Sequence, residues 1–205
     1  MIYEKLNLQF DVAALKKHFE EVVQPLKPLM VSAGFGGWSV LSATGSYMNG
    51  WASGEKLYEP GFLPGKTVAE KAAALGIFET AAYNKPTEIC TGYLASVIDA
   101  VAAAGLNPLR ARLSILKAHG QSKLHRDGSD VEYSVRLHIP IITNPGCIFE
   151  TEGEAVHMPA DGSCYAIHVN RLHQVFNRGD QDRLHLIMNI KDTSGFTKHH
   201  RYTQA

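Results

Sequence analysis

The spacing of apolar residues changes at about Arg110, and this change constrains the fold more than any other feature. In the run Tyr133–Ile141, every second residue from Val135 is Val, Leu or Ile, whereas Arg136 and His138 share the opposite side. Similar alternating runs occur at 112–116, Cys164–Asn170 and Arg183–Ile190. Turn signals rather than helices separate these runs, which predicts a β-sandwich or barrel over about residues 108–192.

The first half of the chain has the patterns of helices and loops. Asp11 can cap a helix that runs to about Val23, and Thr67 and Glu70 form a capping box for a helix that ends near Gly76. A further helix is expected at 93–104, and the segment 31–65, rich in Gly and Pro, is expected to form loops with short strands.

These patterns predict a mainly β, α+β chain of one domain. Residues 1–107 form a helical and loop part packed on the β core at 108–192, and residues 193–205 form a tail. An apolar content of 45% in 205 residues is enough for a sizeable buried core.

Charge and cysteine content exclude several classes of function. Lys plus Arg and Asp plus Glu each number 20, and no basic block is present, so no nucleic-acid partner is expected. The 3 cysteines are widely spaced and predict no disulfide framework. Without an apolar signal core or a run near the ~20 residues of a membrane span, we expect a soluble, cytoplasmic protein.

His125 and Asp127 are the first candidates for metal binding. Two residues apart on an extended chain, their side chains point to the same side and can share one ion. A third ligand must come from elsewhere, and the candidates are His157, His168, His173 and His185. We favour His173 because it opens an alternating segment just before a turn at Arg178. Two imidazoles and one carboxylate favour non-haem Fe(II) chemistry with O2.

If 2-oxoglutarate chelates such an iron, its far carboxylate needs a buried cation, and Arg183 is the candidate. Arginine matches a carboxylate in two-point geometry. By spacing alone, Arg183 has an even chance of facing the interior or solvent. Arg136 and His138 face inward with it if the barrel closes, and Ser114 could add a hydroxyl donor.

Taken together, these residues resemble the aspartyl/asparaginyl β-hydroxylase-like family of 2-oxoglutarate oxygenases, which includes bacterial amino-acid hydroxylases. The resemblance covers about 113–192, and its anchors are Ser114, His125-Arg-Asp127, Arg136-Leu-His-Ile-Pro140, His173-Gln-Val-Phe-Asn177 and Arg183-Leu-His-Leu186. It implies a double-stranded β-helix, or cupin-like jelly roll. It also implies His125 and His173 as iron ligands, and Arg183 with Ser114, Arg136 and His138 around 2-oxoglutarate.

The expected function is therefore Fe(II)- and 2-oxoglutarate-dependent hydroxylation of a free amino acid or a small derivative, coupled to succinate formation. Asp127 resembles the bacterial amino-acid branch, since the animal peptidyl enzymes lack this carboxylate. Two alternatives remain: hydroxylation of Asp or Asn in a peptide or carrier-bound substrate, and a non-catalytic sensor of small acids. Trp38 and Trp51 could wall the site, although packing is the more common role of buried aromatics. The sequence leaves the substrate, the oxidised carbon and the oligomeric state open.

Overall fold

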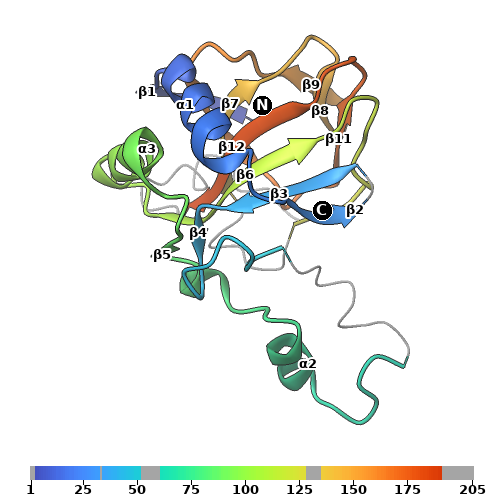
Figure 1. The fold of residues 1–205 in the computed structure, drawn as a ribbon. Helices are drawn as coiled ribbons and strands as arrows, with labels where there is room; N and C mark the ends of the chain where they lie inside the picture. The colour runs from blue at the N-terminus through green and yellow to red at the C-terminus, as the bar shows by residue number, and fades with distance from the viewer. Residues whose placement is uncertain (1–2, 33, 52–60, 128–134, 191–205) are drawn as a thin grey trace.

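The protein is built around one large antiparallel sheet (Figure 1). The structure, a computed structural model, describes residues 3–32, 34–51, 61–127 and 135–190. The large sheet has 7 strands, in the spatial order β1 (Tyr3–Gln9), β10 (Ser163–His168), β7 (Val135–Ile142), β12 (Arg183–Ile190), β6 (Pro108–Leu116), β3 (Phe35–Ser39) and β2 (Leu29–Ser32). The alternating segments predicted from the sequence supply its central strands.

Two smaller sheets complete the β structure. A 3-stranded sheet has the order β11 (His173–Asn177), β8 (Cys147–Thr151) and β9 (Glu154–His157), and a 2-stranded sheet joins β4 (Leu41–Ser42) to β5 (Lys85–Pro86). The 3-stranded sheet faces the inner side of the large sheet, because Phe149 and Val156 pack against Tyr165 and Ile167 of β10. Two facing antiparallel sheets confirm the predicted cupin-like jelly roll.

The predicted helices are also present. α1 (Val12–His18) begins after Asp11, whose side chain accepts a hydrogen bond from the Ala14 amide, and it continues as the π-helical turn η1 (Phe19–Val23). The remaining helices are α2 (Val68–Ala74), the 3-10 turn η3 (Thr80–Ala82) and α3 (Gly92–Ala103). In Figure 1, α1 and α3 lie beside the large sheet, whereas α2 lies apart from it. α2 buries none of its residues.

The central strands are buried on both faces, and the two faces differ in chemistry. On β12, Leu184, Leu186, Met188 and Ile190 belong to the main apolar core that the sheet shares with α1 and α3. The alternate residues, beginning with Arg183, point to the other face, toward the 3-stranded sheet. Because the helix side supplies most of the apolar burial, the inner face is left to carry polar side chains.

The N-terminal part, for which helices, loops and short strands at 31–65 were predicted, also supplies strands to the large sheet. β1, β2 and β3 come from the N-terminal part and join the large sheet. β1 and β2 are its edge strands. β1 exposes polar side chains, and β2 has only 4 residues and is largely exposed, so neither has the long buried pattern that marks a central strand. β8 and β9 also went unpredicted, and the proposed tail at 193–205 lies outside the described residues. None of the described helices has the length and apolar character required to cross a membrane.

Asn177 fastens β11 to the large sheet. Its side-chain nitrogen donates to the carbonyl oxygens of Leu116 (3.1 Å), Lys117 (3.1 Å) and Gln181 (2.8 Å). The Asn177 side chain is only 1% exposed, so water cannot replace these contacts.

We expect Asn177→Ala to lower the free energy of unfolding by about 3 kcal/mol, because it leaves several buried carbonyls without a donor. Asn84→Ala is the matched control, since the exposed Asn84 amide donates only to Ala81. Urea denaturation of both variants provides the measurement. A loss under about 0.5 kcal/mol for Asn177→Ala would show that this side chain does not fasten the sheets.

Candidate active site

The two candidate metal histidines are brought together by their own backbones. The His125 amide donates to the His173 carbonyl at 3.0 Å, and the His173 amide donates to the His125 carbonyl at 2.8 Å. This isolated antiparallel bridge sets the two imidazole rings 4.3 Å apart between centroids. The Asp127 amide donates to the Val169 carbonyl at 2.9 Å, which returns the third side chain to the same place.

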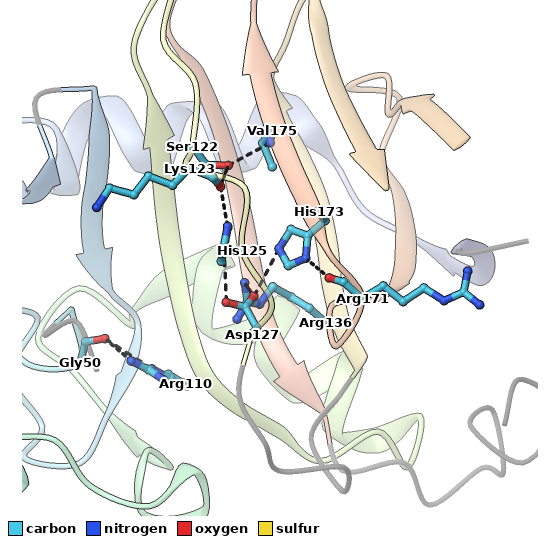
Figure 2. Close-up of polar contacts among 10 residues, drawn as sticks. All are labelled: Gly50, Arg110, Ser122, Lys123, His125, Asp127, Arg136, Arg171, His173 and Val175. Carbon is cyan, nitrogen blue, oxygen red and sulfur yellow. Dashed lines mark hydrogen bonds and ion pairs between the residues drawn. The ribbon is translucent and has the colours of Figure 1, made fainter. Parts of the chain in front are cut away.

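Together these three side chains form the His125/Asp127/His173 trio, whose ligand atoms all lie within 4.8 Å of one another (Figure 2). His125 Nε2 lies 3.4 Å from Asp127 Oδ1, and His173 Nε2 lies 3.7 Å from Asp127 Oδ2. Two imidazole nitrogens and one carboxylate at this spacing could hold one divalent metal ion. The structure thus brings together the three residues that the sequence singled out.

Backbone carbonyls orient both imidazoles for metal binding. His125 Nδ1 donates to the Lys123 carbonyl at 2.7 Å, and His173 Nδ1 donates to the Arg171 carbonyl at 2.8 Å. A carbonyl only accepts, so each Nδ1 carries the proton and each Nε2 presents its lone pair toward Asp127. The Phe149 ring, stacked at 5.0 Å, also limits the rotation of His173.

Arg136 holds the third candidate ligand in its charged form. Its Nη1 lies 2.6 Å from Asp127 Oδ2, and only 12% of the Arg136 side chain is exposed. Burial by itself would raise the pKa of Asp127, but the Arg136 guanidinium keeps it well below its usual range. Asp127 is therefore a carboxylate at neutral pH.

Arg183 faces the interior, where it belongs to a second cluster of polar side chains. It is 3% exposed, and its guanidinium donates to His185 Nδ1 at 2.9 Å. His138 Nδ1 lies 3.4 Å from the same atom, and Ser114 is paired with His185 across β6 and β12. Burial lowers the pKa of Arg183 to about 10, so it remains cationic. The Nε2 atoms of His138 and His185 have no hydrogen-bond partner within the described chain.

The other sequence candidates lie elsewhere. His157 Nδ1 donates to the Cys147 carbonyl, and His168 and His185 do not join the trio. Arg171 pairs with Glu152 at 3.0 Å, and its side chain points away from the trio in Figure 2.

Sequence reasoning missed one neighbouring residue of the site, Arg112. Arg112 is buried beneath the Trp51 ring, with its guanidinium carbon 4.8 Å from the ring centroid. Trp38 packs on Phe19 within the main core, as expected of a structural aromatic. Arg112 shares the alternating run with Ser114, so the period that revealed one could have revealed the other.

The sequence of the chain matches a known protein family. Residues 74–193 match the family model of aspartyl/asparaginyl β-hydroxylase. The chain belongs to this family. It is therefore a 2-oxoglutarate-dependent hydroxylase, which uses Fe(II), 2-oxoglutarate and O2. The trio fits such an iron, because its three ligand atoms are the kinds that non-haem Fe(II) binds.

Solved structures of two oxygenases are similar to this chain at low sequence identity. A prolyl-4-hydroxylase from Pseudomonas putida has a TM-score of 0.50 at 12% identity, over 92% of this chain and 91% of that one. A 2OG-Fe(II) oxygenase-family oxidoreductase from Burkholderia pseudomallei has a TM-score of 0.47 at 13% identity, over 88% of this chain and 77% of that one. The search of curated proteins gave no match.

The buried histidines predict how the metal-free protein responds to acid. Burial lowers the pKa of His173 to about 4, and it lowers those of His138 and His185 well below their usual values. Below about pH 6.5 these three histidines bind protons in the unfolded chain but stay neutral in the folded protein. The free energy of unfolding therefore decreases as the pH is lowered. The pKa of His125 is raised, chiefly because its protonated ring can donate a hydrogen bond to Asp127, and this acts in the opposite direction.

We expect each of the three buried groups to remove about 1 kcal/mol from the free energy of unfolding between pH 7.5 and 5.5. Urea denaturation with EDTA at both pH values provides the measurement. His138→Gln should make the pH dependence shallower, whereas His119→Gln, at a side chain 67% exposed, should not change it. Equal stability at both pH values would contradict the neutral state of these histidines.

Proposed function

We propose that the chain hydroxylates a free amino acid or a small amino-acid derivative at an iron bound by His125, Asp127 and His173. Arg183 binds the far carboxylate of 2-oxoglutarate, and Ser114, Arg136 and His138 complete that cosubstrate site. Bound Fe(II) and 2-oxoglutarate supply the oxidising chemistry, in which 2-oxoglutarate becomes succinate and CO2.

One observation carries the assignment of the metal ligands. Both candidate histidines donate Nδ1 to a backbone carbonyl two residues earlier and aim Nε2 at the same carboxylate. A structural ion pair needs no such arrangement, since a His paired with Asp normally donates a proton to it. In metal sites, the ring nitrogen that does not bind the ion commonly donates to a backbone carbonyl, which fixes the tautomer of the histidine.

The assignment of Arg183 rests on burial and missing counter-charge. No carboxylate contacts its guanidinium among the described residues, although it is 3% exposed. A buried cation of this kind is costly unless a ligand supplies the anion. The free Nε2 atoms of His138 and His185 beside it add further donors or acceptors for a carboxylate.

Arg136 lies between the two groups and takes a distinct part. Its contact with Asp127 positions the carboxylate, and its Nε has no hydrogen-bond partner in the described chain. That free donor can bind the end of 2-oxoglutarate nearest the iron, while Arg183 binds the other end.

A specific observation favours a second candidate, the peptidyl or carrier-bound substrate. Leu124 and Leu172 immediately precede the two metal-binding histidines, are 61% and 40% exposed, and line a groove with residues 150–155. A groove that begins beside the iron could take the chain around a target Asp or Asn. A succinate-release screen over the standard amino acids and Asp- or Asn-containing peptides separates the two: turnover of peptides alone would overturn the free amino-acid proposal.

For the iron site, we expect Asp127→Ala to weaken Fe(II) binding at least about 100-fold, because it removes the only anionic ligand and leaves Arg136 facing the ion. The measurement is the intensity of the visible charge-transfer band during anaerobic titration with Fe(II) in the presence of 2-oxoglutarate. Asp180→Ala, at a side chain 95% exposed, is the control. An unchanged titration in Asp127→Ala would exclude this carboxylate as a ligand.

For the cosubstrate site, we expect Arg183→Met to raise the Kd for 2-oxoglutarate about 100-fold or more while Fe(II) binding persists. Isothermal titration of the anaerobic Fe(II) enzyme measures the change. Arg178→Met serves as the control, since this arginine pairs with Glu150 on the surface. Retained 2-oxoglutarate affinity in Arg183→Met would show that another cation binds the far carboxylate.

A further inference from the structure

Arg112 is a second buried cation that the cosubstrate site does not use. It is 8% exposed, and its Nε has no hydrogen-bond partner within the described chain. Its guanidinium stacks on the Trp51 ring at 4.8 Å and makes no hydrogen bond or ion pair with the described residues. Aromatic stacking holds a guanidinium in place but leaves its in-plane donors unsatisfied, which is costly in a buried setting.

The charges around Arg112 are mostly of the same sign. Arg110 and Arg136 both oppose its positive charge, and of the acidic groups only Asp127 acts to offset it. Asp127 is already paired with Arg136 at 2.6 Å. Three cations therefore share the influence of one carboxylate, which leaves an excess of positive charge for a ligand to neutralise.

This cation is distinct from the one that takes 2-oxoglutarate. Arg112 is paired with Ile187 on β12, and Arg183 is four residues away on that strand, or about 13 Å at 3.3 Å per residue. Arg183 is not among the charges that affect Arg112. A single 2-oxoglutarate, with one end at the iron and the other at Arg183, leaves Arg112 without an anion.

Neutral contacts hold the side chains around Arg112 in place. Arg110 donates to the Gly50 carbonyl at 3.1 Å and lies 5.0 Å over the Tyr83 ring (Figure 2 shows the Gly50 contact). Trp51 Nε1 is buried and also lacks a hydrogen-bond partner in the described residues.

Gly37 makes room for this arrangement, because a Cβ there would lie 2.9 Å from the Trp51 ring. The ring, the backbone and the two guanidiniums are thus positioned by neutral contacts. Two cations without a carboxylate of their own, together with the unpartnered Arg112 Nε and Trp51 Nε1, suit a carboxylate ligand.

We propose that Arg112, supported by Arg110 and Trp51, binds a carboxylate of the primary substrate beside the iron. This inference rests on the proposed function and narrows it. The substrate class is an amino acid or derivative that keeps a free carboxylate, and a neutral amide of the same molecule is excluded. Trp51 then acts as part of the substrate site, and the N-terminal half of the chain contributes to substrate choice.

The first test needs no known substrate. Because Arg112 is a buried cation without a counter-ion among the described residues, Arg112→Met raises the Tm of the full-length protein in sodium chloride by about 2–4 °C. In protein loaded anaerobically with Fe(II) and 2-oxoglutarate, so that the Arg183 site is filled, sodium acetate at the same ionic strength raises the wild-type Tm further. It has no effect on Arg112→Met loaded in the same way. Arg178→Met, whose guanidinium also stacks on an aromatic ring at 4.5 Å, keeps the acetate response. A lower Tm with an unchanged acetate response in Arg112→Met overturns the proposal.

The second test measures selectivity with the Fe(II) and 2-oxoglutarate-loaded enzyme. Each standard amino acid is assayed for succinate release as the acid and as its carboxamide. For any amino acid accepted, wild type prefers the acid at least about 100-fold in kcat/KM, and Arg112→Lys loses most of this preference. An equal preference in Arg112→Lys overturns the proposal even where Arg112→Met does not fold.

The two tests separate this inference from the proposed function. If wild type shows no charge-transfer band with Fe(II) and 2-oxoglutarate, the proposed function fails, whatever acetate does. If the band is present in wild type and in Arg112→Met, but acetate stabilises both proteins equally, the substrate subsite fails and the oxygenase site stands. Loss of acetate stabilisation in Arg183→Met instead would assign the effect to the cosubstrate arginine and overturn the role of Arg112.

Discussion

The whole molecule depends on a sheet whose two faces do different work. On β12, four apolar side chains beginning with Leu184 join the core beneath α1 and α3, while Arg183, His185 and Asn189 face the interior of the jelly roll. Apolar burial on the helix side supplies the driving force for folding. The inner face can then hold charged groups whose burial costs free energy.

The interior polar groups are rigid before any ligand arrives. Backbone hydrogen bonds between His125 and His173 define where the imidazoles lie, and carbonyls of neighbouring residues define which nitrogen is free. Arg136 keeps the Asp127 carboxylate ionised and oriented. Preorganisation of this kind lowers the entropy lost when a metal or cosubstrate binds.

The charge balance of the interior follows from this preorganisation. Arg112 and Arg183 are both buried without a carboxylate partner among the described residues, so the folded protein holds stored electrostatic cost at two places. Such cost is tolerated where a ligand returns it on binding. The family of the chain supplies one anion, 2-oxoglutarate, and the second cation indicates a second anion.

The sequence alone determined the central strands, the helices and the family of the chain. The alternation after Arg110 predicted the central strands, capping residues such as Asp11 and Thr67 predicted the helices, and the order of His125, Asp127, His173 and Arg183 predicted the family. These are local signals, because period and capping depend on residues close together in the chain.

Only the tertiary structure decided the rest. Spacing left Arg183 equally suited to solvent or interior, and the pairing of β12 between β6 and β7 turned it inward. The tertiary structure also brought Trp51, from the N-terminal half, over Arg112 of β6. Contacts between segments so far apart arise from sheet order and register, which no local pattern in the chain encodes.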